Sequence, residues 1–265
     1  MKYKSNLPIL ASVLIGLAMT LNVLVANAQK SSSSVKSEKS TIVLVHGAFA
    51  DGSGWSYVIP LLEKDGYPVI AAQNPLTSFT DDVATTRRVI DANPAGVVLV
   101  GHSYGGTVIT AASVGAPNVR ALVYVAAFAP DSGETIGALL EKYPSLIGTA
   151  LVPDAAGFLY IDRSKFNEAF AKDVPPQEQR VMAATQKPIN SAIFGYTHGT
   201  PGWKSVPSWY LVATQDQAIN PELQRMFAKR MKAKTTEVAA SHVPFISQPA
   251  AVVKMIVEAA TAKSK

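Results

Sequence analysis

The sequence predicts an α/β fold in which a mostly parallel sheet of about six strands has helices on both faces. Two observations predict it. Short apolar runs rich in valine and isoleucine alternate along most of the chain with longer amphipathic stretches. The runs are continuous and lack a polar residue at every second position, which is typical of parallel strands buried on both faces. Buried strands that alternate with helices are in turn the pattern of an α/β sheet.

The first half of the domain contains the most regular part of this alternation. The apolar run Thr41–Val45 predicts the first strand, and a glycine-rich turn follows it. A helix is expected next, ending at Gly66, which favours a helix C-terminus. The expected elements after the first strand are, in chain order, helix 55–65, strand 67–72, helix 81–92, strand 96–100, helix 104–114 and strand 119–126.

The alternation returns near the C-terminus, after an interruption. There the expected elements are strand 208–213, helix 221–232, strand 235–239 and helix 249–262. Between Pro130 and Val206 the chain is rich in proline and helical in tendency, and it is too long for an ordinary loop. We therefore expect a helical cap, made of short helices, inserted at about residues 131–206.

The N-terminal residues are typical of a secretory signal peptide. Two lysines precede the apolar run Ile9–Val25, and Ala26-Asn27-Ala28 has the small residues of a cleavage site. An uncleaved membrane anchor is the alternative, although polar residues interrupt the run. We expect a signal peptide at 1–28, a Ser- and Lys-rich disordered linker at 29–40 and one globular domain at 41–265. The mature protein would be exported, to the periplasm or the medium, without stable membrane association.

Composition excludes several classes of partner and cofactor. The net charge of +5 comes partly from lysines in the two tails, so no basic face for nucleic acid is indicated. The chain has no cysteine, which excludes disulfides, thiolate metal sites and a cysteine nucleophile. Its few histidines show no metal-ligand spacing, and Gly52-Ser53-Gly54 is only a fragment of a dinucleotide-binding motif. We expect no metal and no cofactor.

One glycine-rich segment carries the main chemical signal. Gly101-His102-Ser103-Tyr104-Gly105 has the form G-x-S-x-G and lies between an expected strand and an expected helix. In that context the serine sits on a sharp, strained turn, and the residues two positions either side must be small. The turn would raise the Ser103 hydroxyl above the carboxyl edge of the sheet as a nucleophile. A glycine-rich turn with an incidental serine is the alternative.

A serine hydroxyl needs a base to remove its proton as it attacks. Among four histidines, we expect His242 to be that base, because its loop follows the last predicted strand and reaches the same sheet edge. His102 should point away from Ser103. His46 should shape the turn after the first strand, and His198 lies in the expected cap. An ordinary surface-loop role for His242 is the alternative.

A carboxylate should hold the imidazole of the base in one tautomer. Asp216 follows the penultimate strand, in a loop expected to abut that of His242. The alternative acid is Asp131, which follows strand 119–126. The oxyanion would need amide donors, for which we expect those of Tyr104 and Ala48. Phe49 is the fallback for the second donor and a candidate substrate contact.

Several motifs resemble the α/β-hydrolase superfamily over essentially the whole mature chain. They are Val43–Phe49, Leu99–Gly106, Ser208–Ala213 with Asp216, and Ser241-His242. The cap placement resembles the branch of small bacterial esterases, plant methylesterases and hydroxynitrile lyases. The resemblance implies the α/β-hydrolase fold, a triad of Ser103, Asp216 and His242 in the usual chain order, and a cap that roofs the substrate pocket. Lyases of this branch carry a lysine directly after the catalytic histidine; Val243 stands there, so we do not expect lyase chemistry.

Together these features predict a serine hydrolase. We expect a carboxylic-ester hydrolase that acts through an acyl-enzyme on small to medium apolar esters, since the expected cap is rich in aromatic residues. A lactonase, a thioesterase or a carbon–carbon bond hydrolase would use the same triad. A non-catalytic binding protein of the same fold is a further alternative. The sequence does not indicate an oligomeric state.

Overall fold

The structure is a computed structural model that describes residues 39–262. The expected signal peptide at 1–28 and nearly all of the expected linker at 29–40 lie outside the described residues, so both stay predictions. Within the described part, no helix is long and apolar enough to cross a membrane.

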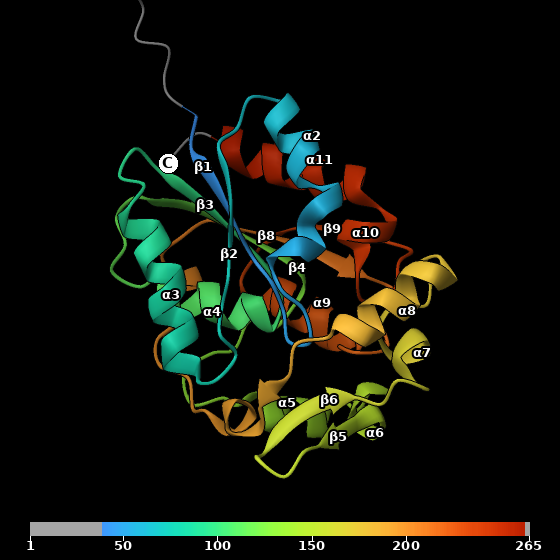
Figure 1. Cartoon of the computed structure of the whole chain (residues 1–265). Helices are drawn as coiled ribbons and strands as arrows, with labels where there is room; N and C mark the ends of the chain where they lie inside the picture. The colour runs from blue at the N-terminus through green and yellow to red at the C-terminus, as the bar shows by residue number, and fades with distance from the viewer. Residues whose placement is uncertain (1–38, 263–265) are drawn as a thin grey trace, which may run out of the picture. The chain divides into compact units, whose positions relative to one another are not determined.

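Six parallel strands form the central sheet (Figure 1). They are β1 (Thr41–Val45), β2 (Val69–Ala72), β3 (Val97–Ser103), β4 (Val119–Ala127), β8 (Ser208–Ala213) and β9 (Lys234–Val238). Their order across the sheet is β2-β1-β3-β4-β8-β9, and every neighbouring pair is parallel. Every residue of β1, β3 and β8 is buried. The predicted α/β class is therefore confirmed, with the strands whose sequences are most continuously apolar at the centre.

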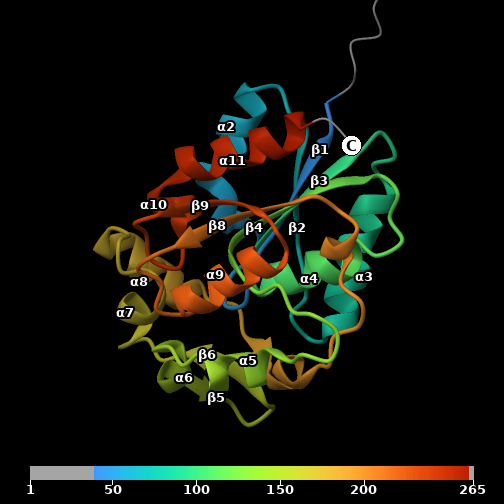
Figure 2. The same ribbon diagram turned by 180° about the vertical axis from the view of Figure 1, so that it is seen from behind.

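Helices cover both faces of this sheet (Figures 1 and 2). On one face α2 (Ile59–Lys64) packs on α11 (Pro249–Thr261), which in turn contacts β3, β4 and β8. On the other, α3 (Phe79–Asp91) packs on α4 (Tyr104–Ala112), which lies against β3 and β4. The helix α9 (Pro221–Arg230) follows β8 and packs against it.

One expected helix, 55–65, is divided in the structure. A 3₁₀ turn, η1 (Gly52–Tyr57), precedes the short α2, and Pro60 lies in the first turn of α2. Because proline has no amide hydrogen to donate to a preceding carbonyl, it begins a helix more readily than it continues one. The single-helix prediction was wrong for this reason.

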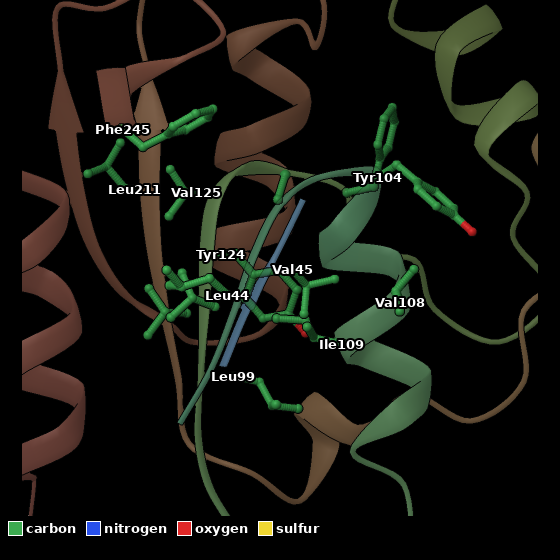
Figure 3. Packing of buried hydrophobic residues seen from close by; sticks show 14 of the residues in the cluster. Leu44, Val45, Leu99, Tyr104, Val108, Ile109, Tyr124, Val125, Leu211 and Phe245 are labelled. Carbon is green, nitrogen blue, oxygen red and sulfur yellow. The ribbon is translucent and has the colours of Figure 1, made fainter. Parts of the chain in front are cut away.

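The core lies between the sheet and its helices. Figure 3 shows Val45 and Leu99, from neighbouring strands, on the side of the sheet that faces Val108 and Ile109 of α4. All four side chains are fully buried. Burying a side chain of this size contributes about 1.5–3 kcal/mol, so this layer holds the helix that begins at the G-x-S-x-G turn firmly on the sheet.

The segment 131–206, which we call the cap segment, lies beyond the carboxyl ends of the strands (Figures 1 and 2). Its helices are α5 (Ile136–Lys142), α6 (Ile147–Ala150), α7 (Phe166–Phe170), α8 (Pro176–Thr185) and the 3₁₀ turns η2 (Ser191–Gly195) and η3 (Gly202–Lys204). It also holds an antiparallel sheet of β5 (Leu151–Pro153), β6 (Phe158–Ile161) and β7 (Ile189–Asn190).

The cap segment thus contains the expected short helices and, in addition, three short strands that the sequence analysis did not predict. Gly157, at φ +82°, and the Asp154 carboxylate, which accepts the amides of Ala156 and Phe158, form the turn that reverses the chain between β5 and β6. The aromatic and branched residues of β6 favour an extended backbone. Turn chemistry of this kind overrides the weak helical tendency of the surrounding sequence.

Candidate active site

Ser103 lies at the sharp turn where β3 ends and α4 begins. Its backbone has φ 51° and ψ −124°, a conformation that residues other than glycine rarely adopt. Such a conformation costs about 1–3 kcal/mol and persists only where the surroundings impose it. The buried strand β3 and the buried helix α4 supply that constraint on either side of Ser103.

The glycines around Ser103 permit three backbone segments to approach closely. A Cβ added at Gly105 would lie 2.4 Å from the carbonyl oxygen of Val45 and 2.7 Å from that of His46. A Cβ at Gly101 would lie 2.6 Å from the carbonyl oxygen of Gly105. These neighbours are backbone atoms and cannot rotate away. The turn at Ser103 therefore needs glycine at both positions, as the G-x-S-x-G motif predicted.

We expect Gly105→Ala to lower the melting temperature by about 10 °C or to prevent folding. The clash with the backbone of β1 should cost about 3 kcal/mol, and each kcal/mol shifts the melting temperature of a domain of this size by about 2–4 °C. Gly148→Ala is the matched control, because no atom lies within 4 Å of an added Cβ there. Circular dichroism during heating measures the melting temperatures of the two variants. Equal melting temperatures would contradict the close approach of Gly105 to the backbone of β1.

His242 and Asp216 form a buried pair at the same edge of the sheet. The His242 Nδ1 lies 2.7 Å from Asp216 Oδ2, and both side chains are almost completely buried. The Oδ1 atom of Asp216 accepts the amides of Ala218 at 2.7 Å and Ile219 at 3.0 Å. The carboxylate is thus fixed by its own loop and oriented toward the imidazole. Nδ1 donates to it, which leaves the lone pair on Nε2 available to accept a proton.

The other imidazole nitrogen of His242 is buried and has no hydrogen-bond partner among residues 39–262. Ser103 and His242 line the same pocket. Catalytic hydrogen bonds are often long in an enzyme without substrate and shorten when substrate binds. An unpartnered Nε2 in the same pocket as a strained serine is therefore suited to general base catalysis.

Sequence reasoning missed Gln224, a fully buried residue of α9. Its Nε2 donates to Asp216 Oδ2 at 2.8 Å and to the Ile219 carbonyl at 2.9 Å. Its Oε1 accepts the amide of Ala213, the last residue of β8, at 3.0 Å. The sequence feature that could have revealed it is a polar residue within the apolar stripe formed by Leu223, Phe227 and Ala228. A buried polar side chain in such a stripe must be hydrogen-bonded.

Sequence reasoning also missed Asp173, which connects the cap segment to the histidine loop. Its carboxylate accepts the amide of Ser241 at 2.9 Å and the hydroxyl of the same residue. Ser241 directly precedes His242. Asp173 lies 68 positions away in the chain, and no local pattern marks such a long-range contact.

The alternative acid, Asp131, lies elsewhere. Its Oδ1 forms an ion pair with Lys204 Nζ at 2.5 Å and accepts the amide of Ser132. Partial burial raises the pKa of Asp131, but the Lys204 ion pair and the Ser132 amide outweigh it and lower that pKa. The structure thus pairs Asp216, and not Asp131, with His242.

The three remaining histidines take part in structural contacts. His102 Nε2 donates to the carbonyl of His242 at 2.8 Å, so its side chain braces the histidine loop. His46 Nδ1 donates to the Gly47 carbonyl and its Nε2 accepts the amide of Asn74, which requires a neutral ring. His198 is buried in the cap segment beside Phe79. Burial lowers the pKa of His46 to about 4 and that of His198 to about 4.

We expect the free energy of unfolding to fall as the pH drops from about 6.5 toward 4. In this window the unfolded chain protonates His46, whose pKa is ordinarily 6.5, while the folded chain keeps it neutral. Each such group contributes a slope of up to about 1.4 kcal/mol per pH unit. The free energy of unfolding, measured with urea between about pH 5 and 7, should depend less steeply on pH in His46→Gln. The difference in slope should correspond to about one proton. Equal slopes in the two proteins would contradict a neutral, buried His46.

The candidate oxyanion donors surround the same pocket. Ala48, Phe49 and Tyr104 line it together with Ser103 and His242. Tyr104 is the first residue of α4. The hydroxyl of Tyr104 donates to buried Asp82 at 2.6 Å and so anchors the tyrosine side chain. Ala48 and Phe49 belong to the turn after β1, and Phe49 has a positive φ of 61°. The structure thus brings together the residues predicted from the two glycine-rich turns.

The pocket is small and apolar. Its cavity volume is about 30 Å³. Besides the residues above, its walls are apolar side chains such as Phe128, Ile136, Leu140, Ile147, Phe170 and Phe194. Ser103 and His242 supply its reactive polar atoms. Among residues 39–262, no group of three or more histidine, aspartate or glutamate side chains is placed to hold a metal ion.

Comparison with known proteins shows the family and the fold of the chain. Residues 42–255 match the alpha/beta hydrolase family. Methylesterase 8 of Arabidopsis thaliana is 28% identical, over 79% of this chain and 84% of its own. The pyrethroid hydrolase of Sphingobium wenxiniae is 28% identical, over 84% and 89%. A solved pyrethroid hydrolase from Sphingobium faniae superposes with a TM-score of 0.74 at 24% identity, over 84% of this chain and 98% of its own. The protein is an enzyme that belongs to the alpha/beta hydrolase family.

Proposed function

We propose that the protein is a carboxylic-ester hydrolase that acts on small to medium apolar esters through an acyl-enzyme. Ser103 is its nucleophile, His242 its general base and Asp216 the acid that orients the base. The observation that carries this proposal is the buried His242–Asp216 pair, 2.7 Å apart, in an apolar pocket that also contains a strained serine. Strained serines, histidine–carboxylate pairs and apolar pockets together are typical of acyl-transfer sites.

The proposed reaction has two halves. As Ser103 Oγ attacks the ester carbonyl carbon, its proton passes to His242 Nε2. Asp216 stabilises the imidazolium that forms. The amides of Tyr104 and Ala48 hold the oxyanion, and His242 then returns the proton to the departing alkoxide. In the second half, water attacks the acyl-enzyme with His242 again as base; the bond to Ser103 Oγ breaks, His242 returns the proton to Oγ, and the carboxylic acid leaves.

The apolar walls favour an uncharged ester. A charged acyl group would lose its hydration in this pocket without gaining an ion-pair partner from the walls, which is costly. Relatives named as methylesterases and a pyrethroid hydrolase support ester hydrolysis rather than lactone, thioester or carbon–carbon cleavage. Val243, directly after His242, provides no cation for lyase chemistry. We also propose that the protein is exported, on the strength of residues 1–28.

A graded series of p-nitrophenyl esters tests the proposed function. We expect the purified protein to hydrolyse short acyl chains best, and a fluorophosphonate probe to label it at Ser103. A flat profile across polar and apolar acyl groups would contradict the substrate class. Folded protein that neither hydrolyses any ester nor reacts with the probe would instead favour a non-catalytic role. Labelling without ester turnover would direct the search to lactones, thioesters and carbon–carbon substrates.

A further inference from the structure

A second hollow lies next to the active-site pocket. This outer groove runs between the turn 49–56 and the helix α8, with Phe245 and Ile246 at one side, and has a cavity volume of about 240 Å³. It offers much more room than the pocket that contains Ser103, whose cavity volume is about 30 Å³. Two side chains, those of Phe49 and Phe170, line both hollows.

These two rings form the wall between the pocket and the groove. Their centroids are 6.4 Å apart and their planes nearly perpendicular, at 84°. Phe49 is 6% exposed and Phe170 is 3% exposed, so together they close the pocket on this side. Phe170 also lies 4.8 Å from the His242 ring, centroid to centroid. The two rings therefore separate the groove from the pocket that contains Ser103 and His242.

The small pocket cannot enclose both halves of a medium-sized ester. In a serine hydrolase the acyl group stays bound to the nucleophile after the alcohol leaves, and water must then enter where the alcohol was. The half that leaves first therefore needs the side with more room. The small pocket suits a compact acyl group, and the larger groove behind two aromatic rings suits the alcohol.

We propose that the outer groove is the binding site for the alcohol half of the ester, with Phe49 and Phe170 as the gate between the two subsites. This inference rests on the proposed ester hydrolysis and specifies its substrate class. The substrate is an ester of a compact apolar acid with an alcohol that is extended and mainly apolar.

The charges of the outer groove further restrict which alcohols could bind there. Val181, Met182 and Phe245 give it apolar contact area, and Val181 is 55% exposed. Asp51 and Glu178 stand on its opposite walls, and none of the residues that line it is a lysine or an arginine. Carboxylates on both sides repel a third negative charge. The alcohol half is therefore neutral or cationic, not anionic.

Two isomeric esters test which half lies in the groove. Hexyl propanoate carries its long chain on the alcohol, and propyl hexanoate carries it on the acid. In Val181→Trp the new ring obstructs the groove, and we expect kcat/KM for hexyl propanoate to fall about tenfold. The values for propyl hexanoate and methyl propanoate should stay within about twofold of the unsubstituted protein. Val114→Trp is the matched control, since Val114 is 45% exposed and lines neither hollow.

Each other outcome overturns the proposal in a recognisable way. A selective loss for propyl hexanoate would place the acid, not the alcohol, in the groove. If kcat/KM for both isomers in Val181→Trp were unchanged from the unsubstituted protein, the groove would bind no part of the substrate, while turnover of methyl propanoate would still support ester hydrolysis. If the unsubstituted protein hydrolysed none of the three esters, the proposed function would fall together with this inference.

A second variant tests the charge preference. Glu178→Gln removes one groove carboxylate and keeps the shape of the side chain. We expect kcat/KM for 4-(propanoyloxy)benzoate, an anion, to rise about two- to fivefold relative to that for the cationic 4-(trimethylammonio)phenyl propanoate. An unchanged ratio would exclude the groove as the place where the aryl alcohol binds.

Discussion

Substitution of Ser103 by alanine is expected to lower kcat for p-nitrophenyl butanoate by at least about 10⁴-fold. The variant keeps the pocket and the oxyanion donors but has no atom that can form the acyl-enzyme. Only the slow catalysis that comes from binding and oxyanion stabilisation remains. Serine and alanine must each adopt the same backbone conformation at position 103, with φ 51°. The free energy of unfolding should therefore change by less than about 1 kcal/mol.

Ser113→Ala is a matched control for this substitution. Ser113 is also buried, lies at the other end of α4, and donates only to the Thr110 carbonyl. Its replacement should leave kcat within about twofold. Urea unfolding of both variants shows that each is folded. If Ser103→Ala kept the rate of the unsubstituted protein, Ser103 could not be the nucleophile and the proposed mechanism would be wrong.

The parts of the fold that the sequence predicts well are those where one signal dominates. Four of the five residues of Thr41–Val45 are apolar without alternation, which predicts a strand buried on both faces, and all five are buried. The G-x-S-x-G segment predicts its own geometry, because only glycine fits where Gly101 and Gly105 approach other backbone. His242 and Asp216 follow from topology, since loops after parallel strands meet at one edge of the sheet.

The parts that the sequence does not predict depend on contacts between distant segments. Asp173 reaches Ser241 across 68 positions, and nothing in its neighbours indicates a partner. The strands β5, β6 and β7 pair within a segment whose composition favours helix, and one residue in the left-handed region, Gly157, decides the turn. The outer groove likewise exists only because α8 packs near the turn after β1.

Those same distant contacts determine what the triad tolerates. Each oxygen of the Asp216 carboxylate already accepts two hydrogen bonds. Oδ1 accepts the backbone amides of Ala218 and Ile219, and Oδ2 accepts from His242 and Gln224. An asparagine at this position must turn an NH₂ group toward one of these two sets of donors. Both orientations create a conflict, and which one prevails determines the effect on the reaction.

The backbone amides of Ala218 and Ile219 cannot rotate, so they should retain the oxygen of Asn in the Asp216→Asn variant. Its NH₂ then faces His242 Nδ1. Gln224 cannot relieve the conflict by turning its own amide, because its Oε1 accepts the amide of Ala213. The imidazole must therefore accept at Nδ1 and carry its proton on Nε2. A ring in that tautomer cannot take the proton of the nucleophile.

Asp216→Asn is therefore expected to lower kcat by about 10⁴-fold, the loss caused by the wrong tautomer in a serine protease of unrelated fold. Nitrogen-15 NMR of the His242 ring should show the proton on Nε2 in this variant and on Nδ1 in the unsubstituted protein. Asp131→Asn is the control, because Asp131 pairs with Lys204 instead, and its kcat should stay within about threefold. A larger loss in Asp131→Asn than in Asp216→Asn would assign the acid to Asp131, and the hydrogen bonds of Gln224 would then serve only to join α9 to the end of β8.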